Sequence, residues 1–228
     1  MNILYGSIFI CLTILVYLFS KWLYKRVHTP LLLPIAVATV IMIIILLSFQ
    51  VSFDTYMVGG QFISNLLGPA VVALAYPLYQ QRYMLKKLLF PLVTGSLIGA
   101  VVGISSGVIL TKLLGFDAEI IYSMSAKSVT TPVAVEITED LGGVVSLAAV
   151  FVMVAGVGGT MMSPFIYRMF GLTTAIGRGV GIGSASHGIG TAKALESSEL
   201  EGSLSSIAMI LTAVFVSFLT PLLIQILM

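Results

Sequence analysis

Charged side chains are scarce in this sequence: aspartate, glutamate, lysine and arginine together account for 9% of its 228 residues. Hydrophobic residues account for 58%, and the mean hydropathy is +1.12. Soluble domains typically carry about 25% charged residues, so the composition excludes an ordinary soluble protein. It predicts an integral membrane protein surrounded by the lipid bilayer, for which no nucleic-acid partner is expected.

Cysteine and histidine are scarce as well. The single cysteine, Cys11, excludes an internal disulfide and a cysteine metal cluster. No nucleophile stands beside a base, and no set of metal ligands is evident in the sequence. We therefore expect neither an enzyme nor a bound cofactor or metal.

Long uncharged runs divide the chain. A spanning helix needs about 20 apolar residues at 1.5 Å per residue, and such runs predict an all-α, polytopic transmembrane protein with six to eight membrane segments. We expect one integral membrane domain over residues 1–228. The third run contains Pro69 directly after a glycine, so this span is expected to be broken. The uncharged runs are residues 3–20, 31–49, 55–81, 88–111, 141–167 and 202–228.

Glycine recurs at every fourth position of the fourth run. This spacing places the glycines on one face of a helix, and small residues there let another segment approach closely. We expect tight packing along this face, which is a structural role. The glycines are Gly95, Gly99, Gly103 and Gly107.

Basic residues cluster at residues 21–28 and 82–87. Lysine and arginine are enriched in cytoplasmic loops, so both segments are predicted to be cytoplasmic loops and both termini external. Two topologies remain open. Eight crossings would place Arg168 and Arg178 outside. Six crossings with two re-entrant segments would place them inside and let two polar stretches meet near the midplane, as in inverted-repeat transporters.

The first polar stretch, residues 123–138, carries a lysine and several hydroxyls. A charge near the bilayer centre costs roughly 2.5 to 3.5 kcal/mol, so Lys127 is expected to face a ligand, an ion pathway, or a carboxylate such as Glu119 or Glu136. A helix is predicted over residues 133–141, with Thr131 as its N-cap and a helix break at Pro132. Its positive end, the lysine and the hydroxyls offer a site for one small anion. The candidate residues are Lys127, Ser128, Thr130 and Thr131, with Asn65, Ser125 and Glu136 as secondary candidates.

The second polar stretch, residues 177–196, has six glycines in its first fourteen residues. Each interior glycine costs a helix about 1 kcal/mol relative to alanine. A continuous helix is therefore not expected, whereas a close approach of the backbone to a ligand is. For His187, a role in substrate or proton handling and a structural role both remain open, and Lys193 is expected at the membrane interface. The candidate residues here are Ser186, His187, Gly188, Gly190 and Thr191.

Two motifs in these stretches carry a family resemblance. They read Lys-Ser-Val-Thr-Thr-Pro-Val-Ala from Lys127 and Ala-Ser-His-Gly-Ile-Gly-Thr-Ala from Ala185, and the pair Gly142-Gly143 lies between them. With these motifs the chain resembles the CidB/LrgB family of bacterial membrane proteins over essentially its whole length. The family's motif positions fall on Lys127, Ser128, Thr130, Thr131, Pro132, Ser186, His187, Gly188, Gly190 and Thr191.

The resemblance implies a multi-pass protein of the bacterial cell membrane with a smaller CidA/LrgA-type membrane partner, and a homo-oligomer is left open. It also implies two competing functions. One is holin- or antiholin-like control of murein hydrolase activity and cell lysis. The other is transport of a small carboxylate such as pyruvate, as for the similar plastid glycolate/glycerate translocator. A scaffold for the partner is a third alternative. The lysine, the hydroxyls and the helix breaks favour transport, since a pore has little use for them.

Overall fold

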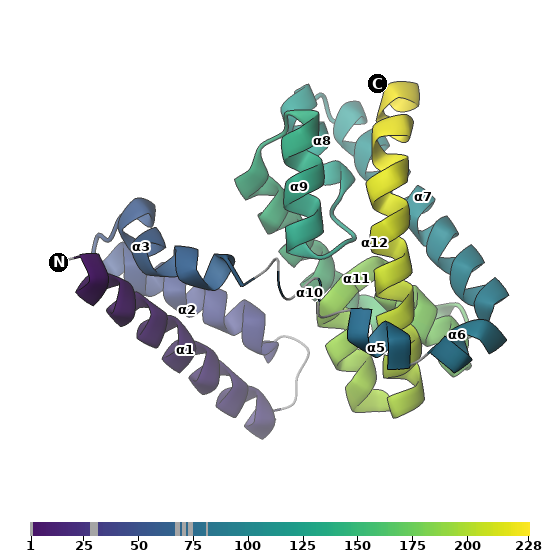
Figure 1. Ribbon diagram of the computed structural model, residues 1–228, viewed down its shortest axis with the longest axis horizontal. Coiled ribbons are helices and arrows are strands. Elements are labelled where there is room, and N and C mark those ends of the chain that lie inside the picture. The colour runs from purple at the N-terminus through teal and green to yellow at the C-terminus, as the bar shows by residue number, and fades with distance from the viewer. Residues whose placement is uncertain (1, 28–31, 67–68, 70–71, 73–74, 81) are drawn as a thin grey trace. The chain divides into compact units, whose positions relative to one another are not determined.

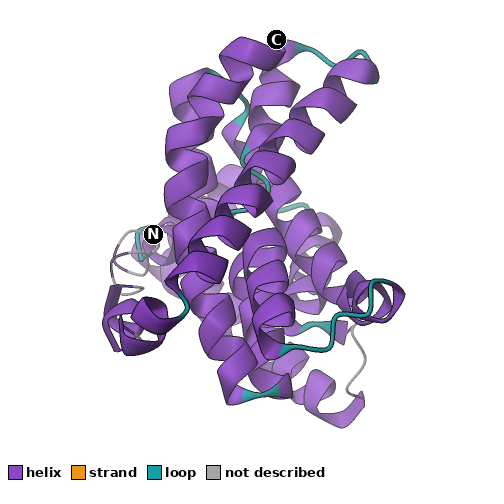
Figure 2. Ribbon diagram, turned by 90° about the vertical axis from the view of Figure 1, so that its right-hand side faces the viewer, coloured by secondary structure: helices purple, strands orange, loops and turns teal. Residues whose placement is uncertain are grey.

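The computed structural model describes residues 2–27, 32–66, 69, 72, 75–80 and 82–228. The regular elements among these residues are all α-helices, which Figure 2 shows joined by short loops. This confirms the predicted all-α membrane fold. The described helices long and apolar enough to cross a membrane are α1 (Asn2–Val27), α7 (Leu89–Leu113), α10 (Val145–Met169) and α12 (Glu199–Leu227).

The chain divides into two compact units, residues 1–72 and residues 73–228. In the first unit, α1 packs against α2 (Pro34–Ser48) and α3 (Phe53–Ser64). Glycines on α1 and α3 allow the closest contact, because a Cβ atom on Gly59 would collide with the backbone of Gly6.

The break predicted in the third apolar run is confirmed. The helix α3 ends at Ser64 and Asn65 occupies its C-cap, four residues before Pro69. The two basic segments are not the loops that were predicted. Residues 21–27 complete α1, and residues 82–87 form the short helix α6 (Arg82–Lys87). Residue 28 lies outside the described residues.

In the second unit, α7 and α12 run in the same direction (Figure 1). In the amino-terminal halves of both helices, the Ser96 hydroxyl donates to the carbonyl oxygen of Ala208 at 3.4 Å. At their carboxyl ends, the Lys112 ammonium donates to the carbonyl oxygen of Leu227 at 2.7 Å. The helix α10 runs in the opposite direction. The short helices α5 (Ala75–Gln80) and α6 precede α7.

A helical hairpin separates α7 from α10. It consists of α8 (Ala118–Ser125) and α9 (Thr131–Leu141). At 1.5 Å per residue these helices are only about 12 and 16 Å long, so neither can cross a hydrocarbon core of about 30 Å. The chain returns to α8 after α9, because the Val144 N–H donates to the Ser123 hydroxyl at 2.8 Å. The hairpin therefore enters and leaves at one end of the unit.

The start of α9 differs slightly from the prediction. The helix begins at Thr131, and Thr130, with extended φ and ψ, is its N-cap. Thr131 is thus the first helical residue and not the cap, while Pro132 occupies the first turn, where its missing N–H costs nothing. The helix ends at Gly142, whose φ of 76° is a left-handed conformation that favours glycine.

A second hairpin lies within α11 (Ala175–Ser197). Its backbone breaks at His187, where φ is 41° and ψ is −133°. The two arms fold back on each other, since a Cβ atom on Gly190 would lie 2.7 Å from the Ile182 side chain, eight residues earlier. Both arms also touch Ser205 of α12, one through the Gly183 backbone and one through Thr191.

The glycine-rich sequence of α11 corrects part of the prediction. Its glycines are helical in both arms, and the break falls at His187. The helix tolerates them because Gly179 and Gly183 lie directly against α12, where side chains would not fit. The two hairpins start from opposite ends of the unit, since α8 follows α7 and α11 follows the antiparallel α10. This arrangement matches the topology with re-entrant segments.

Candidate functional site

The loop at the tip of the first hairpin holds Lys127 against α7. Its ammonium group donates to the carbonyl oxygen of Gly103 at 2.5 Å. Within the described chain Lys127 forms no ion pair, and Glu119 and Glu136, its expected alternative partners, are both exposed. Its positive charge therefore has a carbonyl dipole as its partner and no carboxylate. An anion beside Lys127 would form a charge-assisted hydrogen bond with the ammonium group.

The start of α9 lies at the same tip. Thr130 occupies the N-cap without making a side-chain cap bond, and its hydroxyl is buried without a hydrogen-bond partner among the described residues. The first turn of a helix presents free N–H groups and a partial positive charge. Together with Lys127, this end of α9 offers donors to a small anion.

The tip of the second hairpin is His187, which is 5% exposed. Its Nε2–H donates to the carbonyl oxygen of Val152 in α10 at 3.0 Å, because a carbonyl can only accept. Its ring lies against Gly156, where a Cβ atom would come within 2.6 Å of Nε2. One nitrogen of the ring therefore anchors the tip to α10, which leaves Nδ1 as an acceptor in the neutral tautomer.

Ser186 is the polar counterpart of Thr130 on this second tip. It is 1% exposed, packs against Gly159 of α10, and its hydroxyl has no hydrogen-bond partner in the described part of the protein. An unpaired buried hydroxyl costs about 1 to 3 kcal/mol. Each hairpin thus carries one unsatisfied donor at its tip, which is typical of a site that a ligand completes.

The two tips converge on α7. Along its glycine face, Gly99 contacts Ser184 of the second hairpin and Gly103 contacts Ser128 of the first. These glycines are four residues apart, which is about 6 Å along the helix axis. The predicted close packing at the glycine face is confirmed, because Gly95 and Gly107 contact Val180 and Lys127 in the same way.

The tips also converge on α10 at Val152. The side chain of Val152 packs in one buried cluster with Val129 of the first tip. Its carbonyl oxygen accepts the hydrogen bond from His187 of the second. Two separate helices, α7 and α10, therefore hold both hairpin tips in the interior of the second unit.

The remaining predicted residues lie at several different places. Thr191 supports the second tip, since its hydroxyl donates to the His187 carbonyl at 2.8 Å. Ser125 bonds within α8, donating to the Tyr122 carbonyl at 2.6 Å. Asn65 lies in the first unit, where it is exposed and accepts from Gln61. The structure places Thr131 and Pro132 in the first turn of α9, Gly188 and Gly190 just after the second tip, and Pro69 and Glu136 on exposed surface.

Sequence reasoning missed the helix surface that receives the second tip. Gly156 and Gly159 of α10 leave space for the side chains of His187 and Ser186. Two glycines three residues apart in the sequence were the signal for this close-packing surface.

It also missed a cavity of about 530 Å³ between the ends of α10, α11 and α12. The cavity is lined by Arg168, Arg178, Lys193 and Glu201, with Ser163 and Ile182 at the side of the second hairpin.

The sequence is similar to one family model and to several known proteins. A family model described as the LrgB-like family matches residues 13–226. The relatives include the Uncharacterized protein YxaC of Bacillus subtilis, 45% identical over 94% of both chains. The Holin-like protein CidB of Staphylococcus epidermidis is 39% identical over 97% of this chain and 96% of its own. The Holin-like protein CidB of Staphylococcus aureus is 35% identical over 94% of both chains. No solved structure matches.

Proposed function

The chain belongs to the LrgB-like family of multi-pass membrane proteins, and we propose that it carries a small carboxylate, of the size and charge of pyruvate, across the membrane. The single observation behind the proposal is the meeting of two opposed hairpins at the glycine face of α7. Lys127 supplies charge at that face, and Thr130 and Ser186 supply unsatisfied hydroxyls at the two hairpin tips. Carriers with discontinuous helices bind anionic substrates at such half-helix ends near the midplane.

The energetics favour a small and weakly held anion. A helix N-terminus contributes up to about 2 kcal/mol in a partly buried geometry, and charge-assisted hydrogen bonds contribute about 1.5 to 3 kcal/mol each. The cost of taking the carboxylate out of water opposes these contributions, so the net binding free energy is much smaller than their sum. No catalytic step belongs to this function.

The distribution of charge supports an orientation. Six of the eight lysines and arginines in residues 73–228 lie at the end where α11 begins and ends. The positive-inside rule assigns this end to the cytoplasm, which in the topology with two re-entrant hairpins places the carboxyl terminus outside. The opposite end carries Lys112 and a group of exposed acids. The six basic residues are Arg82, Lys86, Lys87, Arg168, Arg178 and Lys193, and the acids are Asp117, Glu119, Glu139 and Asp140.

The names of the relatives favour a second function. The staphylococcal relatives are called Holin-like protein CidB, so holin-like control of murein hydrolases and cell lysis is the alternative, with a CidA/LrgA-type partner in either case. A holin-like assembly opens a passage that does not discriminate among solutes, whereas a carrier moves only solutes that fit its site.

One experiment separates the two functions. Purified protein, alone and with a CidA/LrgA-type partner, is placed in liposomes that contain unlabelled pyruvate and a trapped fluorescent dye. A carrier exchanges external labelled pyruvate for the internal pool and retains the dye. Dye release with no saturable pyruvate exchange would support the holin-like alternative. If the protein shows neither exchange nor dye release, the scaffold role is the alternative that remains.

A further inference from the structure

Glu201 differs from every other acidic residue of the chain. All nine aspartates and glutamates are described, and eight of them are exposed, whereas Glu201 is 6% exposed. It lies in the first turn of α12, where its backbone contacts Gly179 of α11. Placing an ionised carboxylate out of water costs several kcal/mol unless a cation or hydrogen bonds compensate. Such a group is a candidate for function in a membrane protein.

The groups that face Glu201 line the cavity of about 530 Å³. Tyr167 and Arg168 come from α10, and Arg178 and Lys193 come from α11. None forms an ion pair with Glu201 within the part of the chain that the structure describes.

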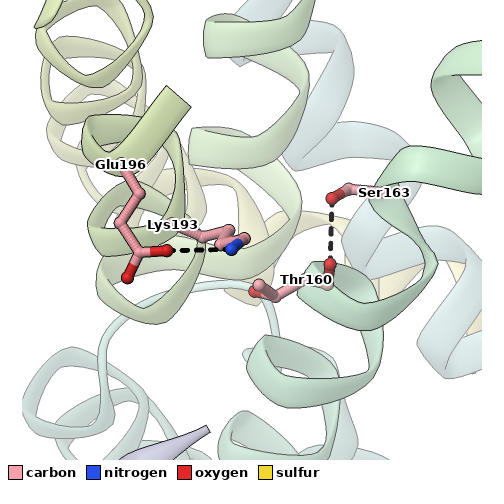
Figure 3. A network of polar contacts seen from close by, with 4 residues as sticks. All are labelled: Thr160, Ser163, Lys193 and Glu196. Carbon is pink, nitrogen blue, oxygen red and sulfur yellow. Dashed lines mark hydrogen bonds and ion pairs between the residues drawn. The ribbon is translucent and has the colours of Figure 1, made fainter. Parts of the chain in front are cut away.

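Two of these cations have other contacts. The Nε–H of Arg178 donates to the Leu172 carbonyl at 2.6 Å, and its guanidinium lies over the Tyr167 ring. The ammonium group of Lys193 pairs with Glu196 at 2.8 Å (Figure 3). The carboxyl group of Glu201 therefore lies among positive charges without being locked to one of them.

The cavity adjoins the elements that hold the second hairpin tip. Ser163 and Ile182 line it. The Ser163 hydroxyl donates to the Thr160 carbonyl at 2.9 Å, and the neighbouring Gly159 contacts Ser186. Figure 3 shows the Lys193 side chain extending from α11 toward this part of α10. Ser163 on the cavity wall is thus about one helical turn along α10 from Gly159, which contacts Ser186 of the candidate site.

Protonation of Glu201 changes how well the cavity attracts an anion. The lining carries three cations, of which Lys193 is already paired with Glu196, and Glu201 is its one acid, so protonation of Glu201 leaves the lining without a negative charge of its own. An entering carboxylate therefore binds more tightly when Glu201 holds a proton, because a like charge has been removed. Linkage is reciprocal, so the bound carboxylate in turn raises the affinity of Glu201 for the proton.

We propose that Glu201 binds one proton together with each carboxylate that enters the cavity, so that the protein couples carboxylate transport to proton transport. The inference rests on the proposed carrier function and adds its coupling ion. The proton and the carboxylate are taken up from the same side, the proton attaching to a carboxylate oxygen of Glu201, and both leave on the opposite side. One positive and one negative charge then cross together.

The test uses the whole chain in proteoliposomes with labelled pyruvate and two assays. An inward proton gradient measures coupled accumulation, and counterflow against internal pyruvate measures exchange, which needs no net proton movement. Glu201→Gln removes the titrating group and keeps the size of the side chain. Glu199→Gln is the matched control, since Glu199 is exposed on the same turn of α12.

Wild type and Glu199→Gln should perform both reactions, whereas Glu201→Gln should exchange pyruvate within about twofold of wild type but fail to accumulate it. Proton-driven accumulation by Glu201→Gln would overturn the coupling role alone. Absence of counterflow in wild type would overturn the carrier function and the coupling with it. If Glu201→Gln does not reach the membrane, Glu201→Asp and Glu201→Ala replace it. The aspartate variant is expected to accumulate pyruvate and the alanine variant is not. Accumulation by both variants would contradict the proposal.

Discussion

At the scale of single residues, Lys127 is the charge around which the candidate site is built. Its ammonium group donates to a backbone carbonyl of α7 and has no carboxylate partner in the described chain. This distinguishes it from Lys193, whose ion pair with Glu196 is typical of an interfacial lysine. A lysine without an acid partner inside a membrane protein is costly to keep unless a ligand uses its charge.

Lys127→Met is expected to abolish carboxylate transport while the protein still inserts, because it removes the charge and keeps a similar length. Lys127→Arg keeps the charge, but a planar guanidinium is larger than the ammonium group that lies close to Gly107, so partial activity at best is expected. Lys25→Met, at the exposed end of α1, is the control. Pyruvate counterflow at matched protein amounts is the measurement, and unchanged rate and affinity in Lys127→Met would remove Lys127 from the site.

The backbone at His187 makes a separate prediction. Its φ of 41° and ψ of −133° suit glycine better than any other residue, and strain of this kind costs about 1 to 3 kcal/mol. His187→Gly removes the ring and relieves the strain, whereas His187→Ala removes the ring and keeps the strain. We expect the glycine variant to unfold at a higher temperature than the alanine variant, as followed by circular dichroism. Equal unfolding temperatures would mean that the turn is not strained.

At the scale of elements, the glycine face of α7 sets the distance between the two hairpins. A Cβ atom on Gly103 would lie 2.9 Å from the Ser128 hydroxyl, so Gly103→Ala must displace the first tip. We expect at least a tenfold loss of pyruvate exchange. Gly158→Ala is the control, because a Cβ atom there meets nothing within 4 Å and alanine is the better helix former by about 1 kcal/mol. Equal activity of the two variants would show that docking on α7 does not shape the site.

The sequence predicted the long helices of the second unit because their apolar runs are long and uninterrupted. It also predicted a helix start next to Pro132, although not its N-cap residue, and the packing of Gly103, since both follow from local chemistry. For the two polar stretches, the sequence did not decide between a membrane-crossing helix and a re-entrant hairpin. That choice depends on which other helices the two arms of each stretch pack against. The helical glycines of α11 show the same limit, since the contact of Gly183 with Ser205 of α12 offsets their low helix propensity.

At the scale of the whole molecule, the account requires residues 84 and 168 to face the same side of the membrane. Met84 packs in the cluster that holds Ala175 near the start of α11, so both residues lie at the basic end of the second unit. In a Cys11→Ser background, cysteines at 84 and 168 should resist an impermeant thiol reagent in intact cells and react in inverted vesicles. Labelling of residue 168 from outside, with 84 protected, would restore the topology with eight crossings.

The central claim is that a carboxylate binds between the two hairpin tips, and the unpaired hydroxyls test it most directly. Thr130→Val and Ser186→Ala each remove a buried donor that nothing in the described chain satisfies. The unfolding temperature should therefore stay the same or rise. Thr138→Val is the control, because its hydroxyl is equally buried and unpaired but lies in the last turn of α9, beside Gly143 and away from the tip.

The measurement is equilibrium binding of labelled pyruvate to the purified protein. The account predicts that Thr130→Val and Ser186→Ala each weaken binding about tenfold or more, as loss of a hydrogen bond to a charged group of about 1.5 to 3 kcal/mol requires, while Thr138→Val binds like wild type. Equal pyruvate affinity in wild type and all three variants would contradict it.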